Sequence, residues 1–408
     1  MAVRTPDPAP SSSDALLDRA RRLHREAPLV DGHNDLVFEI RVKGGGDLGR
    51  MDPDGALPGQ HTDVPRLREG GVGGVFWAAY VPPTLPRDGA ASTFALELIG
   101  LVHAMTERSP HLELARTAAD VERIHAAGRI ASLIGVEGGH ALENSLDTLR
   151  RFAELGARYL TLTHADSTDW ADAATDAERH GGLSRFGEEV VREMNRLGML
   201  VDLSHVSPGT MRHALRVSEA PVVFSHSGVC GVAEHSRNVP DDVLERVREN
   251  RGVVMVNFYP GFVEPRGAEI MRDMFDVQRA LRDRYPDDPR RAHAELEAWR
   301  AARPVPRGSV ATLADHVDHV VRVAGIDHAG LGSDFDGVME LPEGMEDVSR
   351  YPYLTAELLR RGYSDEDAKK VMGGNVLRVM REAEQVAARL QAEREPSKAT
   401  FEELDGAR

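Results

Sequence analysis

The 408-residue sequence contains a single cysteine, Cys230, and no long apolar run. One cysteine cannot form an intramolecular disulfide bond, and such scarcity favours a reducing compartment. The N-terminal stretch lacks the apolar core of a signal peptide, and no segment is apolar for long enough to span a bilayer. From these absences we expect a cytoplasmic protein that does not associate with membranes.

Positive charge is also scarce, because 50 lysine and arginine residues stand against 66 aspartate and glutamate residues. The resulting net charge of −16 makes nucleic acid and anionic membranes poor candidates for partners. The local field of a cleft can differ from this average, so the acidity says nothing about a substrate. With 41% hydrophobic and 28% charged residues, the composition is typical of an ordinary globular protein.

Polar segments at the two ends, residues 1–13 and 393–408, are expected to be weakly ordered tails. Residues 14–392 between them show no long linker and no repeat, which predicts a single domain. Short apolar runs alternate with helical patterns along this region. The eight runs are PLVDGHND (28–35), GGVFWAAYV (73–81), ASLIGVEGG (131–139), YLTLTHAD (159–166), MLVDLSH (199–205), PVVFSHS (221–227), GVVMVNFY (252–259) and HAGLGSDFDG (328–337).

The eight runs are nearly continuous in apolar residues, as parallel strands covered on both faces should be. Several gaps between them, such as SRFGEEVVREMNRLG, begin with serine and end with glycine, which are helix-cap signals. Eight strands alternating with helices predict an α/β fold of the (β/α)8 TIM-barrel type. The charged stretch near 264–303 is expected to be a helical insert on one βα loop. The alternative is a doubly wound open sheet, but the glycine fingerprint that such sheets often carry is missing.

Polar residues end six of the eight runs, and in this barrel the active site lies at the carboxyl ends of the strands. On an extended strand, His33 and Asp35 would point to the same face because they are two positions apart. The second and seventh runs end in aromatic-rich segments instead. The residues expected at the catalytic rim are His33, Asp35, Glu137, His164, His205, His226 and Asp334.

Each of these residues could be an isolated structural polar group. Seven such groups buried on one rim would each cost desolvation energy, whereas a shared metal site accounts for all of them. Imidazole and carboxylate ligands without a thiolate suit zinc, with manganese, iron or cobalt as alternatives. One catalytic zinc needs about three protein ligands, so this larger set fits two ions bridged by a carboxylate, for which we expect Glu137.

Several motifs extend this interpretation from about residue 24 to about residue 385. In order they are DGHNDL, SLIGVEGGH, YLTLTHAD, WAD, VDLSHVS, FSHS, RNVPDD, MVNFY and DFDG. Together they resemble the membrane (renal) dipeptidase family. The resemblance implies a binuclear zinc hydrolase of the metallo-dependent hydrolase architecture, which cleaves dipeptides, often accepts a D-residue at the C-terminal position, and forms a homodimer.

The resemblance also implies a role for each site residue. Carried over by position, His33 and Asp35 would bind the first zinc, and His205 and His226 would hold the second. Glu137 and a water or hydroxide would bridge both ions. His164 would face the scissile carbonyl, Arg237 would hold the substrate carboxylate, and Asp334 would transfer the proton. Animal members of the family are secreted, disulfide-containing and lipid-anchored. This sequence has one cysteine, so we do not carry over the membrane location.

Two alternative functions remain open at this point. One is another binuclear hydrolase of the amidohydrolase type, such as a lactonase or deacetylase. That pattern usually begins with H-x-H and uses a modified lysine, whereas the first run here carries H-x-D and no lysine falls at a strand end. The other is a metal-binding scaffold without catalysis, which would have little reason to keep Asp334 and Arg237 beside the ligands.

Other polar and aromatic residues have less specific interpretations. His316 and His319 precede the last run and are expected to pack or face solvent, away from the rim. Near the rim, His140 and His235 could support the ligands, and Asp336 could replace Asp334. Three aromatic residues close the strands without ligands and could line either a pocket or the core: Trp77, Tyr80 and Tyr259.

Overall fold

The computed structural model describes residues 12–85 and 88–406, which fold around one sheet of parallel strands. Eight of these strands coincide with the eight apolar runs, and β3 is an additional short strand. The strands are β1 (Leu29–Asn34), β2 (Val72–Tyr80), β3 (Leu112–Leu114), β4 (Ile130–Glu137), β5 (Ala157–Thr161), β6 (Leu200–Asp202), β7 (Val223–Phe224), β8 (Val253–Val256) and β9 (Ala329–Leu331).

The sheet closes on itself, which confirms the predicted (β/α)8 barrel. Its order is β2-β1-β9-β8-β7-β6-β5-β4, and a long pairing from Gly74–Ala131 to Tyr80–Glu137 joins β2 to β4. The additional strand β3 pairs with the first residues of β4, whereas β5 pairs with the later residues of β4. All these pairings are parallel, so the carboxyl ends of the eight barrel strands meet at one rim.

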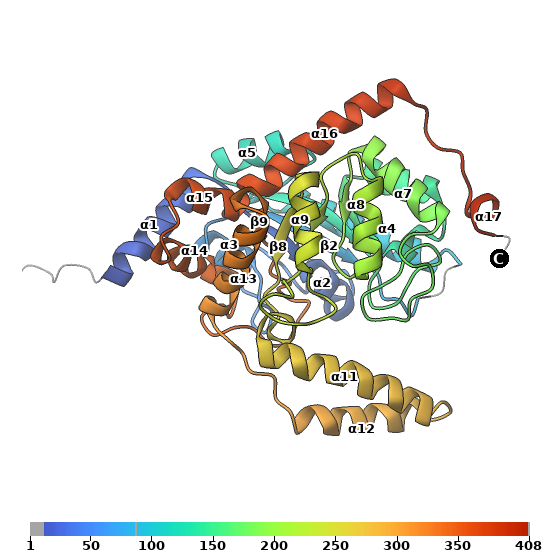
Figure 1. The fold of residues 1–408 in the computed structure, drawn as a ribbon. Helices are drawn as coiled ribbons and strands as arrows, with labels where there is room; N and C mark the ends of the chain where they lie inside the picture. The colour runs from blue at the N-terminus through green and yellow to red at the C-terminus, as the bar shows by residue number, and fades with distance from the viewer. Residues whose placement is uncertain (1–11, 86–87, 407–408) are drawn as a thin grey trace, which may run out of the picture.

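Helices surround the barrel and join its strands (Figure 1). They are α1 (Ser12–Glu26), α2 (Leu36–Gly44), α3 (Val64–Glu69), α4 (Ala90–Arg108), α5 (Ala118–Ala126), α6 (Leu146–Glu154), α7 (Arg185–Leu197), α8 (Pro208–Val217), α9 (Asp241–Asn250), α10 (Pro260–Val263), α11 (Pro265–Arg284), α12 (Pro289–Ala301), α13 (Val310–Val323), α14 (Tyr351–Arg360), α15 (Asp365–Lys369), α16 (Asn375–Glu393) and α17 (Phe401–Leu404). Helix α7 shows the expected caps, since the Ser184 side chain accepts from Gly187 N and Gly198 adopts a φ of 72°.

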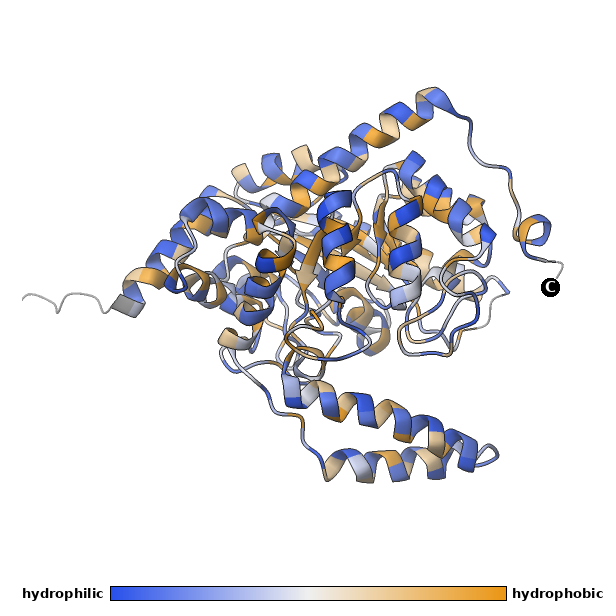
Figure 2. Ribbon diagram, viewed as in Figure 1, coloured by the Kyte–Doolittle hydropathy of each residue, from blue (hydrophilic) through white to orange (hydrophobic). Residues whose placement is uncertain are grey.

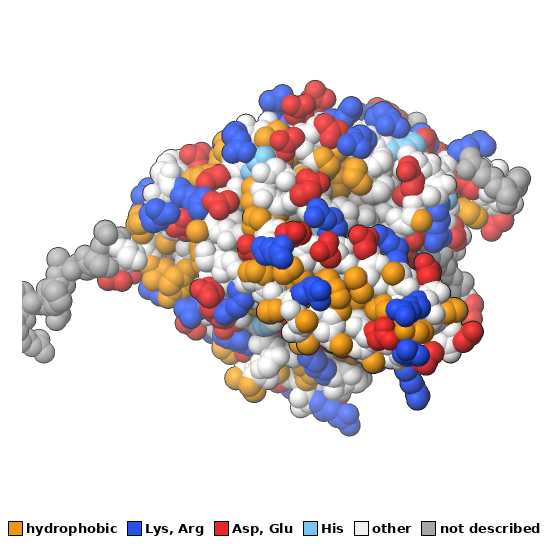
Figure 3. All heavy atoms as spheres, turned by 60° about the horizontal axis from the view of Figure 1, so that its bottom comes forward, with side chains coloured by type: hydrophobic (Ala, Val, Ile, Leu, Met, Phe, Trp, Pro, Cys, Tyr) orange, Lys and Arg blue, Asp and Glu red, His pale blue; other side chains and the backbone are white. Residues whose placement is uncertain are grey.

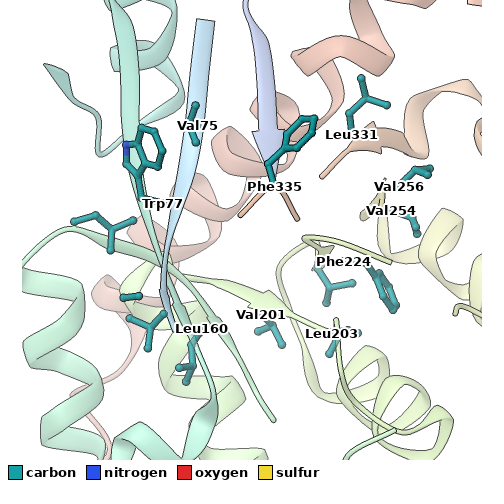
Figure 4. Packing of buried hydrophobic residues seen from close by; sticks show 14 of the residues in the cluster. Val75, Trp77, Leu160, Val201, Leu203, Phe224, Val254, Val256, Leu331 and Phe335 are labelled. Carbon is teal, nitrogen blue, oxygen red and sulfur yellow. The ribbon is translucent and has the colours of Figure 1, made fainter. Parts of the chain in front are cut away.

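Alternate residues along the strands belong to two separate cores. One core contains Tyr159, Val223 and Val253, and the other contains their neighbours Leu160, Phe224 and Val254. This division follows from the two-residue period of a strand, which sends successive side chains to opposite faces of the sheet. Figure 4 shows how the second core gathers side chains from successive strands, and Figure 2 shows hydrophobic strands enclosed by helices of mixed hydropathy.

The stretch near 264–303 forms two helices, α11 and α12, between β8 and β9. They pack against each other and extend away from the barrel as a hairpin (Figure 1). Met271 and Met274 of α11 are buried against Tyr259, and Leu296 and Trp299 of α12 cover this small core. The hairpin therefore has its own apolar core on the loop that follows β8.

The C-terminal segment differs from the weakly ordered tail that we expected for 393–408. After α16 ends at Glu393, the chain returns to α7 (Figure 1), where the ring of Phe401 packs on Phe186 with a centroid distance of 5.7 Å. Asp405 accepts hydrogen bonds from Ser184 Oγ at 2.6 Å and from Phe186 N at 2.8 Å. One aromatic contact and a capping carboxylate thus hold a segment whose polar composition suggests disorder.

At the other end, the expected tail 1–13 lies mostly outside the described residues, and α1 begins at Ser12. None of the helices within residues 12–85 and 88–406 combines the length and the apolar character that crossing a bilayer requires.

His316 has the packing role that its position predicts. It is fully buried, its Nδ1 accepts a hydrogen bond from Val229 N at 3.0 Å, and its Nε2 donates to Val263 O at 2.8 Å. These partners require the neutral imidazole, and burial lowers the pKa of His316 to about 4. Its neighbour His319 pairs with Asp241 at 2.6 Å.

Candidate metal centre

Glu137, the last residue of β4, lies at the centre of the rim. Its Oε2 is 3.4 Å from His33 Nε2, and its Oε1 is 3.1 Å from His205 Nε2 and 3.4 Å from His226 Nε2. His164 Nε2 lies 4.0 Å from Oε1. The two oxygens of one carboxylate therefore face different histidines, although the rings of His33 and His226 are themselves in contact, with centroids 3.9 Å apart.

These residues form overlapping groups whose ligand atoms lie within 4.8 Å of one another. The groups are His33, Asp35 and Asp334; His33, Glu137 and His226; and Glu137, His164 and His205. Six parallel strands or the loops that follow them supply the members, as expected for the carboxyl rim of the barrel. The structure thus brings together all seven rim residues that the sequence predicts.

Residues beneath the rim orient two of the imidazoles. Tyr159, from inside the barrel, places its hydroxyl 2.9 Å from His33 Nδ1. Ser225 Oγ lies 2.8 Å from His226 Nδ1 and donates to Asp202 Oδ2 at 2.6 Å. Since Ser225 gives its own proton to the carboxylate, His226 Nδ1 must be the donor to Ser225, and the lone pair of His226 lies on Nε2 at the rim.

Burial and charge determine the protonation of the rim. Burial lowers the pKa of His205 and of His226 well below the usual range, so both imidazoles are neutral at pH 7. Burial alone would raise the pKa of Glu137, but the neighbouring histidines hold it well below the usual range. For Asp35, burial raises the pKa to about 7.

The rim fits a cation. His205 Nε2 and His226 Nε2 approach to 2.9 Å, and the lone pair of His226 faces this contact. Among the described residues, the buried Asp35 Oδ2 has no well-aligned hydrogen-bond donor, and the ligand atom His33 Nε2 lies 3.3 Å from it. Neutral imidazole nitrogens and carboxylate oxygens converge here with few hydrogen-bond donors between them. Such nitrogen and oxygen atoms are the ligands of a zinc-type metal site.

A cavity of about 440 Å³ opens beside these ligands and is large enough for a small substrate. The walls include Asp35, Glu137, His164, His205 and Asp334. Arg237 also lines the cavity and is only 2% exposed, and burial lowers the pKa of its guanidinium to about 10. Arg237 is therefore still a cation at pH 7, and within the described part of the chain its Nε and Nη1 have no hydrogen-bond partner.

Backbone geometry at the rim is unusual. His205 and Asp334 adopt φ values of 68° and 67°, a left-handed conformation that is uncommon for residues other than glycine. Gly337 follows Asp334 closely, and a Cβ atom there would lie 2.4 Å from both Asp334 Oδ1 and Asp35 Oδ2. The chain thus passes directly against two rim carboxylates, where only glycine fits.

The remaining sequence candidates fall into separate groups. Tyr80 and Tyr259 line the cavity, whereas Trp77 is fully buried in the hydrophobic core. The His235 ring packs at a tilt against Phe262, with centroids 4.8 Å apart, and accepts a hydrogen bond from Arg237 N at 3.1 Å, so it supports the arginine. His140 is buried on the short helix after β4 and is not among the cavity-lining residues.

Asp336 borders the cavity, but its carboxylate is engaged by the loop before α3. Its Oδ1 accepts a hydrogen bond from His61 N at 2.6 Å and one from Gln60 Nε2 at 3.3 Å. Asp336 therefore fastens the loop before α3 to the rim.

Sequence reasoning missed the residues that support the rim. The seventh run carries no ligand, but its Asn257 donates from Nδ2 to Asp334 Oδ2 at 2.9 Å. Tyr159, Asp202 and Ser225 orient histidines from within the strands. Asn257 stands at a strand end, which is a detectable signal, whereas the other three resemble ordinary strand residues.

Comparisons with known proteins agree with this geometry. The sequence model of the membrane dipeptidase family (peptidase family M19) matches residues 17–394. Dipeptidase verJ of Clonostachys rogersoniana is 41% identical over 390 residues, which cover 92% of this chain and 89% of that protein. Dipeptidase 3 of Mus musculus is 41% identical over 381 residues, which cover 92% of this chain and 68% of that protein.

Solved structures share the fold. The probable dipeptidase PvdM from Pseudomonas aeruginosa superposes with a TM-score of 0.79 at 25% identity, covering 92% of this chain and 100% of that one. A metallopeptidase from Rhodobacter sphaeroides, liganded with a phosphinate mimic of the dipeptide L-Ala-D-Ala, has a TM-score of 0.70 at 27% identity, with 88% and 99% covered. The chain belongs to the membrane dipeptidase family, peptidase family M19, and is a metallo-dipeptidase.

Proposed function

We propose that this metallo-dipeptidase is a binuclear zinc enzyme that hydrolyses dipeptides with a free carboxylate, of both the L-Xaa-L-Yaa and the L-Xaa-D-Yaa type. The observation that carries the proposal is the position of Glu137, whose Oε2 faces His33 while its Oε1 faces His205 and His226. A carboxylate whose two oxygens each face different histidines suits two ions better than one.

His33 and Asp35 would hold one ion, His205 and His226 would hold the other, and Glu137 would be shared. When bound, such a zinc pair supplies Lewis acidity that polarises a peptide carbonyl and activates water near pH 7. The protein residues around it bind and orient the dipeptide and move its protons.

Arg237 is suited to hold the carboxylate of the substrate. Its buried guanidinium lines the cavity and keeps two nitrogens unpartnered among the described residues. A planar guanidinium can donate two parallel hydrogen bonds to a carboxylate, which a lysine cannot match. The aromatic ring of Phe262, with its centroid 5.1 Å from Arg237 Cζ, limits the positions that the guanidinium can take.

His164 and Asp334 are suited to the proton and charge changes of hydrolysis. Both line the cavity, and burial lowers the pKa of His164, so its neutral imidazole can donate an N–H to the carbonyl oxygen as negative charge develops there. Asp334 is held by Asn257 at one oxygen and can pass a proton from the attacking water to the leaving amine.

Acceptance of a C-terminal D-residue is supported by the Rhodobacter sphaeroides metallopeptidase, which is 27% identical and was solved with a mimic of L-Ala-D-Ala. We further propose that the protein is a cytoplasmic homodimer. The single cysteine supports the compartment, and the family resemblance supports the dimer. Light scattering after size-exclusion chromatography tests the dimer, and fractionation of the source cells tests the compartment.

The test of function is hydrolysis by zinc-loaded protein of paired L-Ala-L-Ala and L-Ala-D-Ala, with C-terminally amidated forms as controls. We expect both free dipeptides to be cleaved and the amidated forms to be poor substrates. Asp334→Ala should abolish most turnover while both metals stay bound, and Arg237→Ala should mainly raise KM. Equal cleavage of amidated and free dipeptides would contradict the carboxylate role of Arg237, and inactivity on all dipeptides would contradict the proposed function.

A further inference from the structure

The α11–α12 hairpin contributes side chains to the cavity that contains the metal centre. Phe275 of α11 and Arg300 of α12 line it together with Tyr259 and Phe262, which follow β8. Figure 3 turns the hairpin side of the molecule toward the viewer and shows hydrophobic side chains there among arginine and acidic ones. An insert that reaches the substrate cavity can influence which substrates fit.

We propose that Tyr259, Phe262 and Phe275 form a subsite, here called the hairpin subsite, for the side chain of the C-terminal residue of the dipeptide. The substrate class it selects is dipeptides that end in a bulky apolar residue. This inference rests on the proposed dipeptidase function and deepens it.

The aromatic rings of the hairpin subsite form one continuous wall. The Tyr259 and Phe262 rings meet edge to face with centroids 4.9 Å apart, and His235 lies between Phe262 at 4.8 Å and Phe275 at 5.8 Å. Behind them, the Tyr259 hydroxyl contacts the sulfur of Met271 at 3.3 Å. The wall is therefore backed by the hairpin's own core and offers an apolar surface to a ligand.

The position of Arg237 indicates which end of a dipeptide meets this wall. Its guanidinium lies over the Phe262 ring, with 5.1 Å between Cζ and the ring centroid. A carboxylate held by Arg237 places the adjoining Cα, and hence the C-terminal side chain, next to the same ring. Another part of the cavity is lined by Asp35, which would hold a metal ion, and by Glu39, which pairs with Lys43, so that part is polar and does not suit an apolar side chain.

Charge at the hairpin subsite does not favour a charged side chain. Arg300 is half exposed and already pairs with Glu297, with 3.1 Å between Nη1 and Oε1. Glu340 lines the same cavity with the opposite charge. Because one charge is paired and the other opposes it, the aromatic surface determines the selectivity.

The test compares kcat/KM of the zinc-loaded protein for L-Ala-L-Phe and for L-Ala-Gly, and uses their ratio. Phe275→Ala should lower this ratio by about tenfold, because contact with an apolar side chain is lost. Phe275→Trp should also lower it, by narrowing the subsite. Met274→Ala is the matched control, since Met274 packs in the same hairpin core but is not among the cavity-lining residues, and it should leave the ratio within about twofold.

An unchanged ratio in both Phe275 variants would overturn the hairpin subsite while leaving the proposed function intact. The hairpin subsite would also be overturned if wild-type protein preferred L-Ala-L-Glu over L-Ala-L-Phe and Arg300→Ala lost this preference. The arginine, and not the aromatic wall, would then determine selectivity. If wild-type protein cleaves neither L-Ala-L-Phe nor L-Ala-Gly, the proposed function fails and this inference fails with it.

Discussion

The link from Asp202 through Ser225 to His226 predicts that a serine without direct metal contact controls metal affinity. Ser225→Ala removes a hydroxyl that lies 2.8 Å from His226 Nδ1 and 2.6 Å from Asp202 Oδ2. Without it, the imidazole loses the partner that fixes its tautomer and ring orientation. Loss of such an outer hydrogen bond typically weakens metal binding by about 10- to 100-fold, or roughly 1.4 to 2.7 kcal/mol.

The fold should survive this substitution because Asp202 keeps other donors. Thr161 Oγ1 still donates to it at 2.6 Å, and Ser225 N still donates at 2.8 Å. Ser204→Ala is a matched control, since Ser204 is equally buried and bonds to the backbone nitrogen of His226 but not to its ring. Removing either serine deletes one buried hydroxyl, but only Ser225 Oγ contacts the imidazole and the Asp202 carboxylate, whereas Ser204 Oγ reaches Ser225 Oγ at 3.4 Å.

The measurement is zinc affinity by competition with a chromophoric chelator, with circular dichroism as the check on folding. We expect the zinc site that includes His226 to lose about 10- to 100-fold in affinity in Ser225→Ala and less than about threefold in Ser204→Ala. Equal affinities in the two variants would refute the claim that the hydrogen bond to His226 Nδ1 prepares the ligand.

Three further predictions concern packing and protonation. In Gly337→Ala, the new methyl group would lie 2.4 Å from Asp35 Oδ2 and Asp334 Oδ1. The folded variant should therefore bind zinc at least about tenfold more weakly in the same chelator competition, and a wild-type zinc affinity would contradict this prediction. His316 has a folded pKa of about 4, so between pH 6.5 and about 4 the unfolded chain binds a proton that the folded chain does not. The free energy of unfolding should therefore decrease as pH falls through that window, by roughly 3 kcal/mol from this residue. From pH 7 to about pH 5, the melting temperature of His316→Gln should fall less than that of wild type. An equal fall of the two melting temperatures would refute this prediction. Deleting the chain after Glu393 should lower the free energy of unfolding in urea by roughly 1 to 2 kcal/mol, because the aromatic contact on α7 is lost. An unchanged urea midpoint would show that the segment does not stabilise the fold.

The barrel and its rim could be predicted from the sequence because both depend on short-range patterns. Each strand is an apolar run with a polar residue at its end, and parallel strands bring those ends together. His33 and Glu137 are far apart in the chain, yet the topology alone places them on one rim.

Features that depend on tertiary contacts could not be predicted in this way. Asp202 and Ser225 look like strand residues, and their roles appear only when adjacent strands pair. The short strand β3 has too few residues to show a period, and the approach of Phe275 to the cavity depends on how the hairpin packs. The segment after α16 is polar in composition, but Phe401 fixes it to α7.

The central claim is that rim residues from separate strands hold two zinc ions around Glu137, and metal analysis at saturation tests it most directly. We expect two tightly bound zinc equivalents per chain in wild type, with loss of dipeptide hydrolysis on chelation and recovery on adding zinc back. Glu137→Gln should bind fewer than two equivalents. One equivalent or none in the wild-type protein, or two in Glu137→Gln with unchanged affinity, would contradict it.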